Sequence, residues 1–327
     1  MRAAVITEPG GPDVLKIIEV DDPVPGPEDV LIDVKASALN RADMIQRQGN
    51  YPAPAGSPSD IPGLEFAGVV LEAGERVTGM AKGDRVFGLL GGGGYASRTI
   101  THHRMAVRIP DAWDFVQAAA TPEVFFTAYD ALFNRGNLQM GERVLVHAAG
   151  SGVGTAAVQL AHHAGAFVFG TAGSAEKLAG AAELGMDVGI NYHDQDFAEV
   201  VKEHTSGVGV DVLIDFIGAP YWNKNIASMA VLGRLVEVGL MGGSKVEVEL
   251  GQLMGKRLQV TGTGLRGRSL EEKLAVTAQF KRHVLPHLAS GSMKPIVDRT
   301  FPLKEVAEAH RYMETNANFG KIVLTID

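Results

Sequence analysis

From about residue 144 onward, short apolar runs rich in β-branched residues alternate with segments whose apolar positions have helical spacing. A strand begins at Val144, and further strands are predicted at 167–171, 188–192, 210–216, 234–239 and 258–262. Helices are predicted between them, among them 174–184 and a segment that ends near His204. This alternation is typical of a parallel sheet covered by helices on both faces.

The rest of the chain has a different pattern, which is β-rich and irregular. Strands are predicted at 1–7, 30–36, 68–73 and 86–90, and helices at 111–120 and 122–133. Proline clusters at 23–27 and 52–58 mark loops. After Arg268 come a long amphipathic helix, a segment at 295–301 and a final strand at 321–326. The parallel-sheet segment is therefore expected to be an insertion between two parts of another domain.

Composition and charge narrow the classes of function. With 327 residues, 46% hydrophobic content and a net charge of −8, the chain can form two domains, but nucleic acid and anionic membranes are poor partners for it. Cysteine is absent, which excludes disulfides and thiolate metal sites and fits a reducing cytosol. The apolar run at 1–7 is too short for a signal peptide, and no apolar stretch approaches membrane-spanning length. We therefore expect a cytoplasmic protein.

The segment from Val144 to Ala161 combines a strand, a tight turn and a helix in immediate succession. The turn has the spacing Ala148-x-x-Ser151-x-x-Gly154, a variant of the glycine-rich fingerprint of dinucleotide sites. Small residues let the backbone approach a bulky anion, and the start of a helix offers unpaired N–H groups and the positive end of its dipole. A pyrophosphate is the usual ligand of such a turn.

The residues that follow the second strand of the series favour NADPH over NADH. An NAD site has an acidic residue at the end of this strand to bind the ribose 2′-hydroxyl, whereas here the strand ends in Gly170–Ser174 without a carboxylate. Lys177 follows on the next helix and Tyr192 ends the third strand, and an ammonium and a phenol suit a 2′-phosphate. Singly, Lys177 is better explained as a solvated helix residue and Tyr192 as a packed strand end. Together with the missing acid they predict NADPH.

Several separated motifs resemble the zinc-free NADPH:quinone oxidoreductase branch of the medium-chain dehydrogenase/reductase superfamily, the branch related to zeta-crystallin. They are the dinucleotide turn and the segments 37–43, 44–52 and 62–68, and the resemblance extends to 319–323. It implies a Rossmann-type NADPH-binding domain, residues 125–265, inserted into a β-rich GroES-like catalytic domain, residues 1–124 plus 266–327. The cofactor is expected in the cleft between the two, at the carboxyl ends of the strands.

The zinc ligands of other members of the superfamily are missing from this chain. Zinc alcohol dehydrogenases have a cysteine where Asn40 stands, a histidine where Leu64 stands beside Glu65, and a lobe with four cysteines. A catalytic zinc needs about three protein ligands. Ordinary imidazoles are the favoured interpretation of the histidine pairs at 102–103, 162–163 and 283/287. We therefore expect no metal and set zinc-dependent alcohol oxidation aside.

The resemblance also implies roles for individual residues. Asn40 and Tyr51 are expected to be catalytic, Asn40 by offering its amide to the nicotinamide carboxamide or the acceptor and Tyr51 by orienting an acceptor carbonyl. Each has an ordinary alternative, a turn residue between strand and helix for Asn40 and a packed loop aromatic for Tyr51. The expected cofactor-binding residues are Asn40, Thr127, Ser151, Gly152, Val153, Gly154, Gly173, Ser174, Lys177, Tyr192, Leu240, Met241, Gly242, Gly264, Leu265 and Lys321.

Two further expectations concern surfaces. The glycine segment 91–94 and the proline loop 52–58 are expected to border the acceptor site. The basic cluster of Lys256, Arg257, Arg266 and Arg268 is expected to be a solvated, salt-bridged surface on this acidic chain.

An NADPH-dependent quinone reductase, with direct transfer from nicotinamide to the acceptor, is the leading hypothesis for the function. One alternative is NADPH-dependent reduction of an enone, 2-alkenal or enoyl thioester, which requires a group that stabilises an enolate. A non-enzymatic alternative is an NADPH-binding protein of crystallin type. The resemblance also implies a homodimer that pairs through the nucleotide-binding sheet, and we expect neither nucleic acid nor membrane as a partner.

Overall fold

The alternation of strands and helices after residue 144 produces one parallel sheet, as predicted. In the computed structural model, which describes residues 1–327, its strand order is β10-β9-β8-β11-β12-β13. All neighbouring pairs are parallel. The strands are β8 Arg143–Val146, β9 Phe167–Ala172, β10 Val188–Asn191, β11 Val210–Asp215, β12 Met229–Glu237 and β13 Gln259–Gly262. Numbered within this sheet the order is 3-2-1-4-5-6, the order of a Rossmann-type sheet, so the predicted fold class is confirmed.

The helices of this part of the chain include the predicted ones, α3 Pro122–Tyr129, α4 Gly152–His163, α5 Ala175–Glu183 and α6 Phe197–His204, and two that were not predicted, α7 Trp222–Ser228 and α8 Leu250–Lys256. The helix predicted at 122–133 is α3 followed by a π-helical turn at Asp130–Arg135. Side chains of neighbouring strands, such as Leu145, Phe169 and Leu213, form a fully buried core. The central strands β8, β9 and β11 are mostly apolar and buried because helices cover a parallel sheet on both faces, whereas the edge strand β13 is largely exposed.

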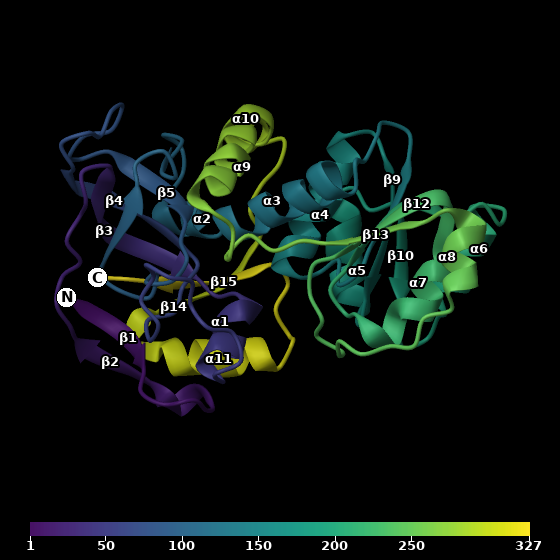
Figure 1. Ribbon diagram of the computed structural model, residues 1–327, viewed down its shortest axis with the longest axis horizontal. Helices are drawn as coiled ribbons and strands as arrows, with labels where there is room; N and C mark the ends of the chain where they lie inside the picture. Colours follow the sequence, from purple (N-terminus) through teal and green to yellow (C-terminus); the bar gives the residue numbers. More distant parts are fainter. The chain divides into compact units, whose positions relative to one another are not determined.

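A second, mostly antiparallel sheet contains strands from both ends of the chain (Figure 1). Its order is β14-β15-β3-β4-β5-β7, with β6 also paired to β3. The bounds are β3 Asp29–Ala38, β4 Glu65–Ala73, β5 Arg85–Leu89, β6 Arg98–His102, β7 Val107–Arg108, β14 Val297–Pro302 and β15 Lys321–Thr325. The pairing of β15 with β3, in which Val323 lies opposite Ala38, makes the C-terminal segment part of the N-terminal domain.

The remaining elements complete this β-rich part of the chain. They are the hairpin β1 Arg2–Ile6 and β2 Leu15–Glu19, and the helices α1 Arg41–Arg47, α2 Phe115–Ala119, α9 Leu270–His283, α10 Leu285–Ser290 and α11 Val306–Glu314. Helix α2 is shorter than the predicted 111–120 because Asp114 caps it, accepting a hydrogen bond from the Gln117 N–H at 2.8 Å. The strands at 15–19 and 98–102 are not among the predicted ones.

By its internal contacts the chain divides into two units. One consists of Met1–Glu123 and Leu265–Asp327, and the other of Val124–Gly264. The first contains the mostly antiparallel sheet and the second the parallel sheet. No helix of either unit is long and apolar enough to cross a membrane.

Candidate active site

The turn between β8 and α4 is closed tightly by its own backbone. Ala148 has a φ of 48°, in the left-handed region, and its carbonyl oxygen accepts a hydrogen bond from the Ser151 N–H at 2.8 Å. Ser151 is the N-cap of α4, where its Oγ accepts from the Gly154 N–H at 3.0 Å. A Cβ on Gly154 would lie 2.2 Å from the Ala148 oxygen, so only glycine permits this approach. The N–H groups of Gly152 and Val153 are left for an external acceptor.

Lys177 and Tyr192 lie beside this turn and the turn that follows β9. A Cβ on Gly150 would lie 3.1 Å from the Lys177 side chain, and a Cβ on Gly173 would lie 2.4 Å from the Tyr192 hydroxyl. Ser174 caps α5 and accepts from the Lys177 N–H at 3.4 Å, which fixes the start of the helix that holds this lysine. An ammonium and a phenol therefore flank glycine-lined backbone next to a helix N-terminus. This donor set fits a dinucleotide with an additional phosphate.

Most of the other expected cofactor residues lie in the loop after β12, in helix α3 and in the segment after β13. Loop 239–243 is tied to the loop after β11, because the Met241 N–H donates to the Phe216 oxygen and the Gly242 N–H to the Ile217 oxygen, at 3.1 and 2.8 Å. Leu240 and Met241 are about half exposed. Thr127 is nearly buried in α3. Gly264 follows β13, whereas Leu265 is buried in the other unit. The structure thus collects the loops after β8, β9 and β10, and separately those after β11 and β12.

Asn40, the N-cap of α1, is held by a buried ion pair in the β-rich unit. The Lys321 ammonium lies 2.8 Å from Glu65 Oε1, and the two side chains are only 4% and 0% exposed. Lys321 also donates to Asn40 Oδ1 at 2.6 Å and to the Leu39 oxygen at 2.7 Å. Asn40 Nδ2 donates to Glu65 Oε1 at 2.9 Å and to the Ala38 oxygen at 3.2 Å. The amide is therefore fixed in one orientation.

This arrangement changes the role expected of Lys321. An ammonium has three N–H bonds, and Leu39, Asn40 and Glu65 supply an acceptor for each. Lys321 has no donor left for a cofactor and contacts Asn40 instead. Asn40 Oδ1 keeps a second lone pair, since an amide oxygen accepts two hydrogen bonds.

Asp43 fixes the backbone around Asn40. Its carboxylate accepts from the Asn40 N–H at 2.8 Å, the Gly63 N–H at 3.1 Å and the Tyr95 hydroxyl at 2.9 Å. Burial raises the pKa of Asp43 to about 6, although these three hydrogen bonds act in the opposite direction. The segment that carries Asn40 is thus anchored by two buried carboxylates, Asp43 and Glu65.

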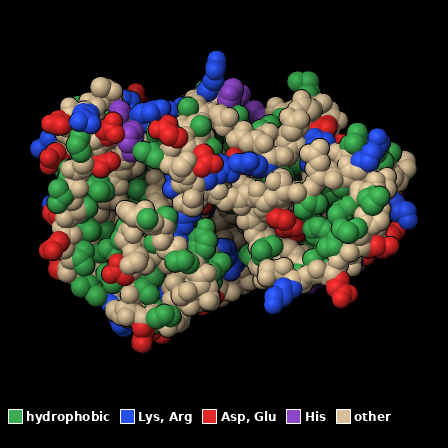
Figure 2. Space-filling model, in the orientation of Figure 1, with side chains coloured by type: hydrophobic (Ala, Val, Ile, Leu, Met, Phe, Trp, Pro, Cys, Tyr) green, Lys and Arg blue, Asp and Glu red, His purple; other side chains and the backbone are tan.

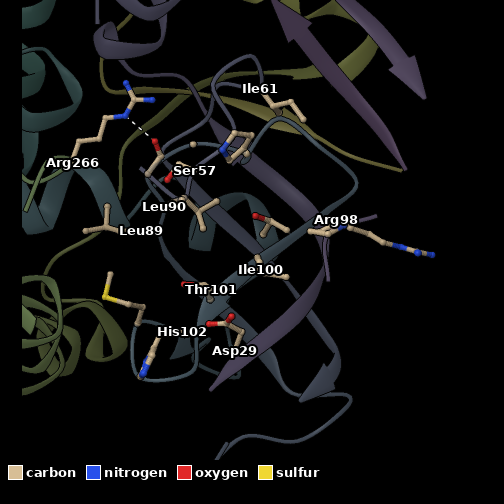
Figure 3. Close-up of a pocket in the computed structure, with 18 of the residues that line it drawn as sticks. Asp29, Ser57, Ile61, Leu89, Leu90, Arg98, Ile100, Thr101, His102 and Arg266 are labelled. Carbon is tan, nitrogen blue, oxygen red and sulfur yellow. Dashed lines mark hydrogen bonds between the residues drawn. The ribbon is translucent and has the colours of Figure 1, made fainter. Parts of the chain in front are cut away.

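A cavity of about 760 Å³ lies in the β-rich unit. Its lining includes Gly91–Gly93 and Gly56–Pro58, so the glycine segment and the proline loop do border the same hollow. In Figure 3, Arg266 lies beside Ser57, and the dashed line marks its Nε donating to the Gly91 oxygen at 2.8 Å. Asn40 and Tyr51 are not among the lining residues. The polar residues that do line it include Arg266, Glu123 and Lys273, none of which was predicted to belong to the site.

Arg266 corrects the expectation of a solvated basic surface. It is 6% exposed and forms no ion pair; besides Gly91 it donates to the Tyr51 oxygen at 3.2 Å and to Gln46 Oε1 at 2.6 Å. Its guanidinium also stacks 4.9 Å above the centre of the Tyr51 ring. Burial raises the pKa of the Tyr51 hydroxyl, which stays protonated as a donor. Arg266 thus joins α1 to the two loops that shape the cavity.

Lys256 departs from the same expectation for a different reason. Its ammonium donates to the carbonyl oxygens of residues 226, 227 and 229 at 2.7 to 2.9 Å and forms no ion pair. It therefore closes the C-terminal end of α7. Arg257 is exposed, as expected.

Glu123 is the second functional group of the cavity that the sequence did not indicate. It lines the cavity together with Arg266 and Lys273. Its backbone N–H donates to Glu65 Oε2 at 2.8 Å, which connects the cavity wall to the ion pair behind Asn40. Burial and the neighbouring Glu65 raise the pKa of Glu123 to about 8. A glutamate in the first turn of a helix is common, so the sequence offered no signal for this environment.

Comparison with known proteins agrees with the two-part architecture. Residues 26–111 match the family "Alcohol dehydrogenase GroES-like domain", and residues 152–279 match "Zinc-binding dehydrogenase". In the structure no group of three or more His, Asp or Glu side chains is placed to hold a metal ion. The GroES-like character expected of the β-rich domain is confirmed.

Individual relatives match over their full length. A human quinone oxidoreductase is 31% identical over 100% of this chain and 98% of its own. A solved Escherichia coli quinone oxidoreductase complexed with NADPH is 32% identical, with a TM-score of 0.90 and coverage of 99% and 100% of the two chains. The solved CurK enoyl reductase is 31% identical, with a TM-score of 0.89 and coverage of 100% and 99%. The chain belongs to the quinone oxidoreductase branch of the medium-chain dehydrogenase/reductase superfamily.

Proposed function

We propose that this protein binds NADPH and uses it to reduce a quinone. The observation that carries the proposal is the convergence of the 148–154 turn, Lys177 and Tyr192 at the carboxyl edge of the parallel sheet. The similarity over the full length to proteins named quinone oxidoreductase, one of them solved with NADPH, supports the choice of reaction.

In this proposal the 124–264 unit binds the cofactor. Ser151 to Gly154 bind the pyrophosphate through the start of α4, and Gly173, Ser174, Lys177 and Tyr192 bind the adenosine 2′-phosphate. Thr127, the 240–242 loop and residues 264–265 contact the nicotinamide half. NADPH, when bound, supplies a hydride, which carries two electrons.

The β-rich unit orients the reactants. Asn40 Oδ1, already fixed by Lys321, accepts a hydrogen bond from the nicotinamide carboxamide. The acceptor occupies the cavity bordered by the 91–93 segment, whose wall includes Arg266. Tyr51, which does not line this cavity but stacks against Arg266, would donate its hydroxyl only to an acceptor carbonyl that reaches past this arginine. Fixed donors and a shaped cavity contribute through orientation rather than through a strong base.

Conjugate reduction of an enone, 2-alkenal or enoyl thioester is the second candidate. The half-buried acid Glu123 and the cation Lys273 in the cavity wall favour it, because hydride addition at carbon leaves an enolate that must be stabilised. The similarity to an enoyl reductase agrees with this alternative.

We also propose a cytoplasmic homodimer. Hydrophobic side chains gather on the face of the 124–264 unit that Figure 2 displays. Leu250, Met254 and Val260 are 66%, 77% and 40% exposed, and β13 is an edge strand of the parallel sheet. An unpaired edge strand beside exposed apolar side chains is a ready surface for association with a second copy.

The test is NADPH oxidation by the purified protein with a panel of quinones and 2-alkenals. Turnover of quinones at higher kcat/KM than 2-alkenals is the expected result. Turnover of 2-alkenals alone would show that the protein is a conjugate reductase and not a quinone reductase. NADPH binding without turnover of either class would contradict the proposed enzyme and favour a binding protein.

A further inference from the structure

Most ionisable side chains that line the cavity are either paired or exposed to solvent. Asp29 accepts from the Gly26 N–H at 3.0 Å, Arg98 pairs with Asp22, and Arg266 donates to the loops described above. Asp21 and Asp60 are exposed. Glu123 and Lys273 differ, because each is half-buried and neither side chain forms a hydrogen bond or ion pair within the chain. They are the two half-buried charged groups of the wall that remain available to a ligand.

The backbone of Glu123 is held in place while its carboxyl is left unbound. Pro122 begins α3, and the Glu123 N–H, one of the unpaired donors at a helix start, is satisfied by the fully buried Glu65 carboxylate. Glu65 is itself fixed by Lys321 and Asn40. The side chain of Glu123 therefore lines the cavity from a backbone that is held in place.

The surroundings of Glu123 keep its carboxyl protonated near neutral pH. Burial is the main cause of the raised pKa, about 8, and the Glu65 and Asp43 carboxylates add to it, whereas Lys321 and Arg266 act in the opposite direction. Lys273 and Tyr51 are the other titratable neighbours, and burial lowers the pKa of Lys273 and raises that of Tyr51. A carboxylic acid that is neutral at pH 7 is a proton donor.

We propose that Glu123 is a catalytic acid of this enzyme, which contacts the acceptor in the cavity and protonates it as it is reduced. The inference rests on the proposed function, since it needs an acceptor that gains a hydride in this cavity. In this proposal Glu123, and not a water molecule, is the immediate source of the second hydrogen.

An acceptor that gains a hydride has gained two electrons and one hydrogen, and its oxygen or α-carbon carries one negative charge. The O–H bond of Glu123 breaks, a new O–H or C–H bond forms on the acceptor, and the bonding pair stays on the glutamate as carboxylate. Lys273 and Arg266, both in the cavity wall, offset this new charge until water returns a proton.

The experiment compares the pH dependence of kcat/KM between pH 6 and 10 for the wild type, Glu123→Gln and Glu123→Asp, with the best quinone or 2-alkenal and saturating NADPH. Glu75→Gln, an exposed glutamate in the turn after β4, is the matched control. The wild type and the control should lose activity as pH rises through about 8. Glu123→Gln should be about 100-fold slower with no such decline, since general acid catalysis is worth about 10²–10⁴. Glu123→Asp should recover part of the rate and the decline.

Two results would overturn the inference while the proposed function stands. One is a Glu123→Gln enzyme with wild-type kcat/KM, and the other is a slower enzyme that keeps the wild-type pH profile, as a purely structural glutamate would produce. NADPH dissociation constants measured for each variant establish that the cofactor site is intact. A wild type that reduces no acceptor would overturn the proposed function and this inference with it.

Discussion

Replacing Gly154 by alanine should damage the pyrophosphate site through one carbon atom. The new Cβ would lie 2.2 Å from the Ala148 oxygen and 2.8 Å from the Ala149 Cα, whereas ordinary contact begins at 3.4 Å. The turn must therefore move by about 1 Å. Such overpacking costs about 1–3 kcal/mol, and alanine in a helix returns about 1 kcal/mol. We expect a net loss of about 0–2 kcal/mol in the free energy of unfolding.

The effect on the cofactor should be larger than the effect on stability. A hydrogen bond to a charged group contributes about 1.5–3 kcal/mol, so the loss of one N–H contact to the pyrophosphate should raise the NADPH Kd about 10- to 100-fold. Gly255→Ala in α8 is the matched control, because nothing lies within 4 Å of its Cβ position. Calorimetric titration and thermal melts measure both quantities. A Gly154→Ala protein with wild-type NADPH affinity would refute this reading of the turn.

Four further results are expected. Lys321→Met leaves the buried Glu65 carboxylate without its cation and should lower the free energy of unfolding by about 3–5 kcal/mol in urea titrations. Lys177→Ala should raise the Kd of NADPH about tenfold and leave that of NADH unchanged in fluorescence titrations. Arg266→Lys loses the planar fork that joins α1 to two loops, and should raise the KM of the acceptor more than that of NADPH in steady-state assays. Because the pKa of Glu123 is raised from 4.5 to about 8, its protonated form stabilises the folded state fully below about pH 4.5, and this contribution is lost as pH rises through about 8. Glutamine does not titrate, so in thermal melts the Tm of Glu123→Gln relative to that of the wild type should increase from pH 5 to pH 9.

The parts of the candidate site that could be predicted from the sequence are those whose geometry is local. Ser151 and Gly154 belong to one strand–turn–helix unit, so their spacing alone predicts the tight turn. Lys177 and Tyr192 follow neighbouring strands, and parallel strands bring their carboxyl ends to the same edge. The inserted organisation was also predictable, because the strand pattern changes near residue 144 and a last strand remains at the C-terminus.

The residues that sequence reasoning missed depend on contacts between distant segments. Arg266 is buried because Gly91, Tyr51 and Gln46, each more than a hundred residues away in sequence, supply its acceptors. The environment of Glu123 is likewise set by Glu65, 58 residues earlier. Neither contact leaves a periodic pattern in the chain, and net charge favoured a solvated arginine.

The central claim is tested most directly by the initial rate of NADPH oxidation with 1,4-benzoquinone by the purified protein, with NADH measured beside it. We expect quinone-dependent oxidation with a kcat/KM for NADPH at least about tenfold above that for NADH, since in the proposed function Lys177 and Tyr192 bind a 2′-phosphate that NADH lacks. No quinone-dependent oxidation, or a preference for NADH, would contradict it.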